Sequence, residues 1–360
     1  MRLPVLRSHA TLQPQELSQA AQDAVGQLLR EGESQNTLAS YRSALRYWAA
    51  WFVLRYGVAL AMPMPAAAVM QFVVDHAERS TEHGLRHELP KDIDQTLVAN
   101  GFKGKLGPLA LNTIVHRLAV LSKAHQMREV KNPCDEPKVR ELLSKTRRAF
   151  AKRGERPAKK DALTSDPLQA LLATCDESLR GKRDRALLLF AWSSGGRRRS
   201  EVANADIGML SLLPGGDFVY NLAHSKTNQA GTDRPDNYKP VVGAAAQAMA
   251  QWLEAASIRE GRIFRRILRG GHVGSPLSAA AVRDIVISRC KLAGVEGAFS
   301  AHSLRSGFVT EADRQGLRLA DTMALTGHTS ISTVMGYTRA SESNRAAALK
   351  ALSALRGTSL

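Results

Sequence analysis

The residues of this 360-residue chain that could do chemistry gather in its second half. Gly195-Gly196 is followed at once by an arginine triplet, Arg197 to Arg199. A guanidinium fork suits two-point contact with phosphate oxygens. His302 and Arg305 come next, three residues apart, so that on a helix they share one face. A histidine beside an arginine is an unusual pair for a protein core, because the arginine charge opposes protonation of the histidine. An anionic ligand bound by both side chains would explain the pair.

A second histidine and a tyrosine complete the set: His328 lies in Thr326-Gly327-His328, and Tyr337 stands nine residues later. Cutting a phosphodiester without a metal requires a nucleophile, cations that stabilise charge on the phosphoryl oxygens, and an acid for the leaving oxygen. Taken singly, an arginine triplet is typical of a basic surface and a lone tyrosine of a core edge. Their joint order favours a phosphodiester site.

The elements around these motifs are predicted to be mainly helical. A helix beginning at Asn36 or Thr37 has its apolar face at Leu38, Tyr41, Leu45, Trp48 and Phe52, and another contains Leu111, Ile114, Val115 and Leu118. Shorter periodic segments at 16–29, 65–76 and 137–150 bring the first half to about five helices. We expect an irregular connection over 79–108, which is rich in glycine, proline and charge.

In the second half, helices are expected at 167–174 and 184–192, and Gly195-Gly196 then interrupts the pattern. The β-prone runs 218–222 and 238–242 predict an antiparallel hairpin, with turn residues at 225–229. Residues 245–355 are predicted to form a series of helices. A chain of this length is expected to hold two domains.

The charge of the chain favours a polyanionic partner. Lysine and arginine total 50 against 33 acidic residues, for a formal charge of +17. Nucleic acid is the leading candidate, and a membrane surface is the alternative. Ten basic residues lie between 138 and 160, where they either contact phosphate or form a solvated face. The predicted DNA-binding residues among them are Arg147, Arg148, Lys152, Arg153, Arg156, Lys159 and Lys160.

Three widely spaced cysteines indicate structural thiols rather than a disulfide framework or a zinc site. The N-terminus has no apolar core followed by a cleavage site, and the most apolar stretch, 58–74, contains Pro63 and Pro65. We therefore expect a cytoplasmic, nucleoid-associated protein without membrane association. No carboxylate lies at ligand spacing near His302 or His328, so a metal site is not expected there.

The second half resembles the catalytic domain of the tyrosine recombinases, the phage integrase family. Arg198 and Glu201 match its Gly-x-Arg-x-Ser-Glu pattern, and Lys226 in Ser225-Lys226-Thr227 looks like the lysine of its β-hairpin. His302 and Arg305 match its His-x-x-Arg, His328 its following histidine or tryptophan, and Tyr337 its nucleophile. Segments 36–42 and 111–118 look like helices of the family's core-binding domain, so that the resemblance spans about residues 34 to 340.

The resemblance implies a role for each matched residue. Tyr337 would attack the phosphodiester and form a 3′-phosphotyrosine bond, with Arg198 and Arg305 on the non-bridging oxygens. His328 would add a hydrogen bond to the phosphate. Lys226 would protonate the leaving 5′ oxygen and His302 would accept the tyrosine proton, while Glu201 would orient these groups. No ATP or metal would be needed.

The resemblance also implies the architecture: a mainly α, two-domain C-shaped clamp with a small antiparallel β-sheet or hairpin. We expect a helical core-binding, DNA-binding domain over 1–152, a basic linker over 153–162, a mixed α/β catalytic domain over 163–340 and a C-terminal helix or tail over 341–360. The partner would be double-stranded DNA with inverted half-sites, bound by a homodimer at one site and by a homotetramer in the synapse. Residues 341–355 would dock on a neighbouring protomer or pack on their own domain.

Three alternatives remain open at this point. A type IB topoisomerase uses similar residues but relaxes supercoils without a specific site. A non-catalytic DNA-binding accessory protein would form no covalent adduct. Metal-dependent hydrolysis through the two histidines would be abolished by EDTA. The target DNA sequence, and the choice among integration, excision and resolution, do not follow from the sequence, because base readout depends on side chains whose positions in the grooves it does not fix.

Overall fold

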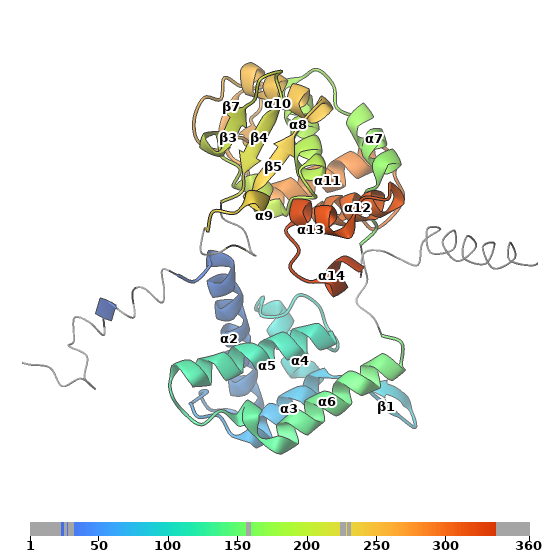
Figure 1. Ribbon diagram of the computed structural model, residues 1–360. Helices are drawn as coiled ribbons and strands as arrows, with labels where there is room; N and C mark the ends of the chain where they lie inside the picture. Colours follow the sequence, from blue (N-terminus) through green and yellow to red (C-terminus); the bar gives the residue numbers. More distant parts are fainter. Residues whose placement is uncertain are drawn as a thin grey trace, which may run out of the picture. The chain divides into compact units, whose positions relative to one another are not determined.

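The computed structural model describes residues 23, 24, 27, 32–155, 160–223, 228 and 232–335. The chain divides into two compact units, 1–157 and 158–360. Both are mainly helical, and the described strands form small antiparallel sheets, which confirms the predicted mainly α fold with a small antiparallel β-sheet (Figure 1). The division falls within the stretch predicted as a linker, whereas the function assigned to each unit stays a prediction.

The first unit is built from helices around an aromatic core. Its elements are α2 (Gln35–Tyr56), α3 (Ala66–His76), β1 (Arg79–Thr81), β2 (Gly84–Arg86), α4 (Lys91–Ala99), α5 (Leu111–Met127) and α6 (Pro137–Lys152). Trp48 stacks on Phe72 with ring centroids 3.8 Å apart, and both are fully buried. Helix α2 begins at Gln35, one or two residues earlier than expected, because Ser34 is its N-cap and accepts a hydrogen bond from the Thr37 amide at 3.1 Å.

The expectation of an irregular connection over 79–108 was wrong. This stretch contains the β1–β2 hairpin and helix α4. Helix α4 has only two buried apolar residues, Ile93 and Leu97, so its periodic signal was short. Its buried Asp94 pairs with Lys103 at 2.5 Å, and this ion pair fastens the loop that follows the helix.

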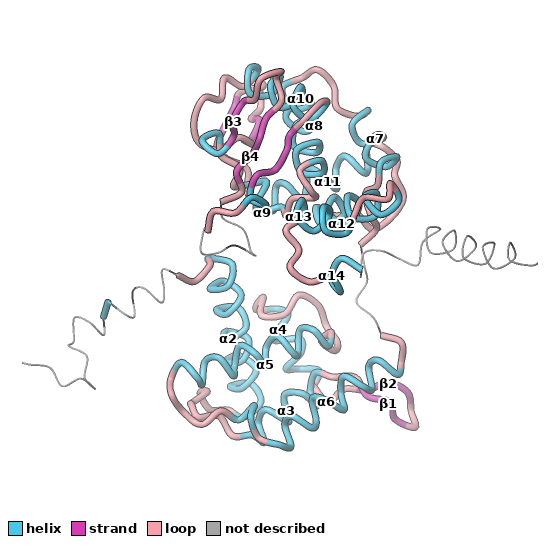
Figure 2. The backbone as a smooth tube through the Cα atoms, in the orientation of Figure 1, coloured by secondary structure: helices cyan, strands magenta, loops and turns pink. Residues whose placement is uncertain are grey.

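The second unit packs helices around α8 and holds two small sheets (Figure 2). Its helices are α7 (Ser165–Ala173), α8 (Leu179–Ser193), α9 (Arg199–Ala203), α10 (Ala244–Ala255), α11 (Ala279–Leu292), α12 (Ala301–Arg314), α13 (Leu319–Thr326) and α14 (Ile331–Met335). Its strands are β3 (Leu210–Leu212), β4 (Phe218–Asn221), β5 (Tyr238–Val241), β6 (Arg265–Ile267) and β7 (Val273–Pro276).

The hairpin predicted from 218–222 and 238–242 is confirmed, because β4 pairs antiparallel with β5. Strand β3 adds a third strand on the other side of β4. The expectation of helices alone after residue 245 was wrong, since β6 and β7 form a second antiparallel pair. These strands have three and four residues, which is too short for a clear alternating pattern.

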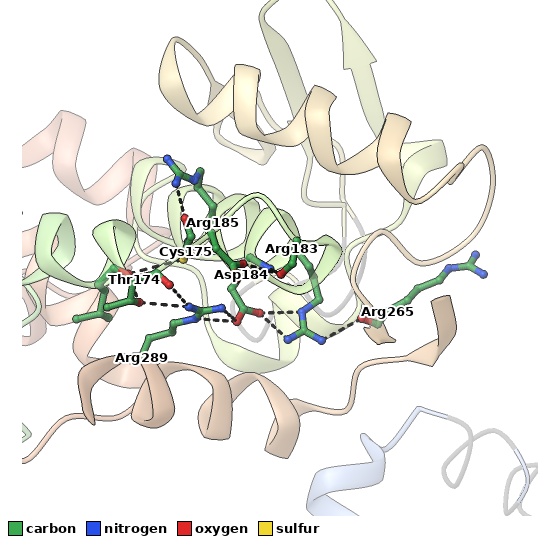
Figure 3. A network of polar contacts seen from close by, with 11 residues as sticks. Thr174, Cys175, Arg183, Asp184, Arg185, Arg265 and Arg289 are labelled. Atoms are coloured by element: carbon green, nitrogen blue, oxygen red, sulfur yellow. Dashed lines mark hydrogen bonds and ion pairs between the residues drawn. The ribbon is translucent and has the colours of Figure 1, made fainter. Parts of the chain in front are cut away.

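A buried ion network ties α8 to α11 in the core of the second unit (Figure 3). Asp184 lies between two arginines: Arg183 donates to one carboxylate oxygen at 2.6 Å, and Arg289 donates to the other at 2.6 Å. Arg289 also donates to the Thr174 carbonyl at 2.5 Å, after α7. Because a buried charge is costly without its partner, this network fixes how the three helices pack.

The cysteines and the hydrophobic segments bear on the expectations about disulfides and membrane association. Cys134, Cys175 and Cys290 are free thiols. In the part of the chain that the structure describes, no helix is long and apolar enough to cross a membrane.

Candidate phosphate-binding site

The glycine pair after α8 brings three segments of the second unit together. Gly195 and Gly196 have φ of 100° and 67°, a region that side chains disfavour. A Cβ on Gly196 would lie 2.5 Å from Arg305 Cα, and one on Gly195 would lie 2.3 Å from the Leu325 carbonyl oxygen. The absence of side chains here therefore lets the loop before α9 touch both α12 and α13, which lie at the same end of the unit (Figure 1).

The three arginines that follow the glycines occupy three different environments. Arg197 is 1% exposed, Arg198 is half-buried and Arg199 is exposed. Arg198 is the N-cap residue of α9, and its side chain lines an open pocket. Arg197 lines the same pocket but is almost fully buried, so Arg198 is the more accessible of the two and also has a fixed position, which is what phosphate binding requires.

Glu201 orients the two arginines that precede it on the loop. Its carboxylate accepts hydrogen bonds from the Arg198 guanidinium at 2.5 Å and from the Arg198 amide at 3.0 Å, and it lies 3.6 Å from Arg197. Burial alone would raise the pKa of Glu201, but the charges of Arg197 and Arg198 outweigh it and lower that pKa. Glu201 is therefore ionised and holds Arg198 at the start of α9.

Helix α12 supplies His302 and Arg305, and Ser300 caps its start by accepting from the His302 amide at 3.3 Å. Arg305 is 2% exposed and donates to the Gly196 carbonyl at 3.1 Å. Partial desolvation, together with the charges of Arg305 and Arg198, lowers the pKa of His302. His302 is therefore mainly neutral near pH 7, the state in which an imidazole can accept a proton.

His328 follows the C-terminus of α13, where Gly327 ends the helix with φ of 67°. Its Nε2 accepts a hydrogen bond from Arg305 Nε at 3.3 Å, so the ring proton resides on Nδ1, which lies 2.8 Å from Thr326 Oγ1. The Thr326 hydroxyl in turn donates to the Thr322 carbonyl at 2.7 Å. Burial, followed by the charges of Arg305 and Arg198, lowers the pKa of His328 to about 4.

Arg198 and His328 share the wall of one pocket with residues from β5 and from the segment before it. Among the described lining residues, four are arginine or lysine and one, Asp236, is acidic. The described lining residues are Arg197, Arg198, Leu222, Asn228, Arg234, Asp236, Asn237, Lys239, Thr326, Gly327, His328 and Thr329. An excess of fixed positive charge in a partly buried pocket suits an anion.

The structure brings together five of the seven predicted site residues: Arg198, Glu201, His302, Arg305 and His328. The other two, Lys226 and Tyr337, lie outside the described residues, as does the predicted C-terminal helix over 341–360.

The predicted DNA-binding residues lie in both units. Arg147, Arg148 and Lys152 are exposed on α6 and Lys160 is exposed in the second unit, whereas Arg156 and Lys159 lie outside the described residues. Arg153 differs from its neighbours, because it donates to Glu155 at 2.6 Å and to the Glu78 carbonyl at 3.1 Å. Its guanidinium also lies 4.5 Å from the centre of the Phe150 ring. These contacts hold Arg153 against its own unit.

Three residues at this site were missed by sequence reasoning: Arg197, Lys239 and Thr326. Arg197 is one of three consecutive arginines, and nothing in the sequence indicates which of them is buried. Lys239 lies two residues before Val241 on the buried face of β5, whereas a lysine in a strand is expected on the solvent face. Thr326 lies two residues before His328, and this spacing was the one sequence signal for a hydrogen bond between the two side chains.

Comparisons with known proteins agree on one family. The model of the phage integrase family matches residues 161–344. The integrase/recombinase xerD homolog of Selenomonas ruminantium is 32% identical over 235 residues, which cover 63% of this chain and 67% of that protein. The chain spans between 59% and 67% of the length of the curated relatives compared.

Two solved structures share the fold. The Tn1549 transposon integrase in complex with transposon right end DNA matches with a TM-score of 0.55 and 15% identity, over 92% of this chain and 98% of that one. A lambda integrase tetramer bound to a Holliday junction matches with a TM-score of 0.51 and 15% identity, over 88% of this chain and 76% of that one. At these identities the likeness concerns the fold alone.

Proposed function

Because the chain belongs to the phage integrase family and is thereby a tyrosine recombinase, we propose that it cuts and rejoins DNA at specific sites through a 3′-phosphotyrosine bond at Tyr337. The observation that carries this proposal is the convergence of Arg198, Arg305 and His328 around the Gly195-Gly196 loop. Two guanidinium groups and an imidazole from separate segments meet next to a cationic pocket. A single scissile phosphate is a ligand that such an arrangement fits.

In this proposal, Arg198 and Arg305 stabilise the charge that develops on the non-bridging oxygens, and Glu201 holds Arg198 in place. His302 accepts the proton of the Tyr337 hydroxyl, and Lys226 donates one to the leaving 5′ oxygen. The electron pair of the broken P–O bond leaves with that oxygen. The phosphotyrosine bond conserves the energy of the phosphodiester, so rejoining needs neither ATP nor a metal.

His328 has a role that depends on the ligand. In the described arrangement its Nε2 accepts from Arg305 and so cannot donate to a phosphate. A phosphate anion beside the arginines would offset the positive charge that lowers the pKa of His328. Binding of DNA is therefore expected to raise this pKa and to favour an imidazolium that donates to the phosphate.

The proposed partner is double-stranded DNA with inverted half-sites, bound by a dimer and then by a tetramer that forms a Holliday junction. Family membership supports this assembly, and a lambda integrase tetramer on such a junction is among the structures of like fold. Residues 1–152 would bind the core of each half-site and 153–162 would link the two domains of a clamp. Residues 341–360 would contact a neighbouring protomer. The exposed Arg147, Arg148 and Lys152 offer phosphate contacts along α6.

The decisive experiment uses a nicked suicide substrate, whose cleavage releases a short fragment so that the covalent intermediate cannot be resealed. Inverted repeats beside the gene provide the candidate site. We expect a denaturant-resistant protein–DNA adduct with the parent protein and with the control variant Tyr238→Phe, since Tyr238 is an exposed tyrosine. Tyr337→Phe should give none, because it lacks the attacking oxygen.

Equal amounts of adduct from Tyr337→Phe and the parent would remove Tyr337 from the mechanism. Robust relaxation of a plasmid that lacks the site would replace site-specific recombination with topoisomerase activity. Loss of adduct on addition of EDTA would contradict the metal-independent reaction.

A further inference from the structure

Two buried cations bind the last carbonyl groups of α13, directly before the turn that carries His328. Lys239 Nζ donates to the Ala324 carbonyl at 2.6 Å, and Arg197 Nη2 donates to the Leu325 carbonyl. Lys239 is 2% exposed and Arg197 is 1% exposed. The carbonyls at the end of a helix have no partner within the helix, so each of these bonds satisfies a group that would otherwise lack one.

The two cations come from different parts of the second unit. Arg197 lies in the loop between α8 and α9, whereas Lys239 lies on β5, where it is paired with Tyr220 of β4. The C-terminus of α13 is thereby joined both to the loop that holds Arg198 and to the small sheet. The next two residues of the chain are Thr326 and Gly327, which lead straight to His328.

Burying two like charges here is costly unless the site compensates for it. Glu201 lies 3.6 Å from Arg197, and the partial negative charge at the end of α13 favours both cations. Burial, followed by the charge of Arg197, lowers the pKa of Lys239 to about 8, so that it is still mostly protonated at pH 7. Apolar residues could fill this space, but they could not hold the two carbonyl groups.

We infer that Arg197 and Lys239 are positioning residues, which fix the C-terminal turn of α13 so that His328 faces Arg305. Their action on a DNA phosphate is indirect, through His328 and Arg305. This inference rests on the proposed function for its catalytic consequence. Its structural consequence, the placement of the His328 ring, can be measured without DNA.

The test replaces each cation with a side chain of similar length that cannot donate, Arg197→Met and Lys239→Met. Matched controls are Arg199→Met, from the exposed end of the same triplet, and Lys291→Met, an exposed lysine on α11. Thermal unfolding establishes which variants fold. The titration of His328 is followed by NMR on the full chain with 13C-labelled histidine, and single-turnover cleavage is followed on the suicide substrate.

In the parent, His328 should titrate near pH 4, and in Lys239→Met its pKa should move toward 6.5, because the ring loses its partly buried setting beside Arg305. In Arg197→Met the loss of the Arg197 charge raises the same pKa directly, so Arg197→Lys, which keeps that charge, isolates the positioning effect of residue 197. Cleavage should slow by about tenfold or more, since a lost charged hydrogen bond at a helix end misplaces the imidazole. Both controls should behave as the parent.

Parental titration and parental cleavage rates in both methionine variants would overturn the inference. Should a methionine variant fail to fold, Arg197→Lys and Lys239→Arg decide instead, because each keeps its charge but places the donor differently. These are expected to fold, to displace the His328 titration and to slow cleavage, and parental values would count against the inference. If the parent forms no adduct, the proposed function fails, whereas the NMR titration still decides the positioning role.

Discussion

His328 is held as a neutral ring by neighbours that occupy its two nitrogens. Arg305 donates to Nε2 at 3.3 Å, and Thr326 Oγ1 lies 2.8 Å from Nδ1. Because Thr326 already donates its own proton to the Thr322 carbonyl, it is an acceptor toward the ring. One threonine thus selects the tautomer on which the arginine depends.

We predict that Thr326→Val, which keeps the shape of the side chain, weakens the preference of His328 for the tautomer with its proton on Nδ1. The ring proton loses its acceptor, so the tautomer with the proton on Nε2, which cannot accept from Arg305, becomes populated. Cleavage should slow by about tenfold, as expected for the loss of a hydrogen bond next to a charged group. The 15N shifts of the His328 ring measure the tautomer, and Thr333→Val, at an exposed position of α14, is the control. Unaltered ring shifts in Thr326→Val would show that the threonine does not set the tautomer.

At this scale, the order of the motifs predicted Arg198, His302, Arg305 and His328, and the structure places them together. Lys239 and Arg197 were beyond prediction for a physical reason. Their partners are main-chain carbonyl groups, which have no signature in the sequence, and burial of a cation depends on packing between distant segments.

At the level of elements, the loop between α8 and α9 packs closely against α12 because Gly195 and Gly196 carry no side chains. We predict that Gly196→Ala destabilises the second unit by about 2 to 5 kcal/mol. About 1–2 kcal/mol comes from the positive φ, and about 1–3 kcal/mol from forcing a methyl group against the Arg305 backbone. Chemical denaturation measures the difference from the parent.

Gly216→Ala separates these two contributions. Gly216 also has a positive φ, 90°, but a methyl group there would meet nothing within 4 Å. Its cost should therefore be about 1–2 kcal/mol, the conformational part alone. Equal losses in the two variants would mean that the close approach of Gly196 to Arg305 contributes little.

The elements that the sequence predicted well are those with a long periodic pattern, such as α2 and α5, or with β-branched and aromatic runs, such as β4. The missed elements are short. Strand β6 is Arg-Arg-Ile and α4 buries only Ile93 and Leu97 among its apolar residues, so that pairing partners and tertiary packing rather than local pattern decide their structure.

For the molecule as a whole, a histidine with a strongly lowered pKa in each unit links stability to pH. Burial lowers the pKa of His76 to about 3 in the first unit, and His328 is lowered to about 4 in the second. An unfolded chain binds these protons near pH 6.5, whereas the folded chain does not. Stability is therefore complete above about pH 6.5 and decreases as the pH falls from there toward the folded pKa values.

We predict a loss approaching about 1.4 kcal/mol per pH unit for the buried His76 between about pH 6 and 4.5, and a smaller loss for His328, because solvent screens its partly exposed ring. Denaturation monitored at pH 7.5, 6 and 5 measures it, and His328→Gln should flatten the dependence in the second unit. Stability that rises on acidification over this range would contradict the neutral state of these rings.

Arg197 and Lys239 donate hydrogen bonds to main-chain carbonyl oxygens, which are present in every amino acid. The identities of Ala324 and Leu325 are therefore irrelevant to this contact, although the contact itself holds the turn before His328. In evolutionary terms, positions 324 and 325 can drift among helix-forming residues while 197 and 239 stay constrained. Methods that detect contacts from correlated substitutions would miss both hydrogen bonds. The acceptor is a main-chain carbonyl group, which is the same whichever residue occupies position 324 or 325.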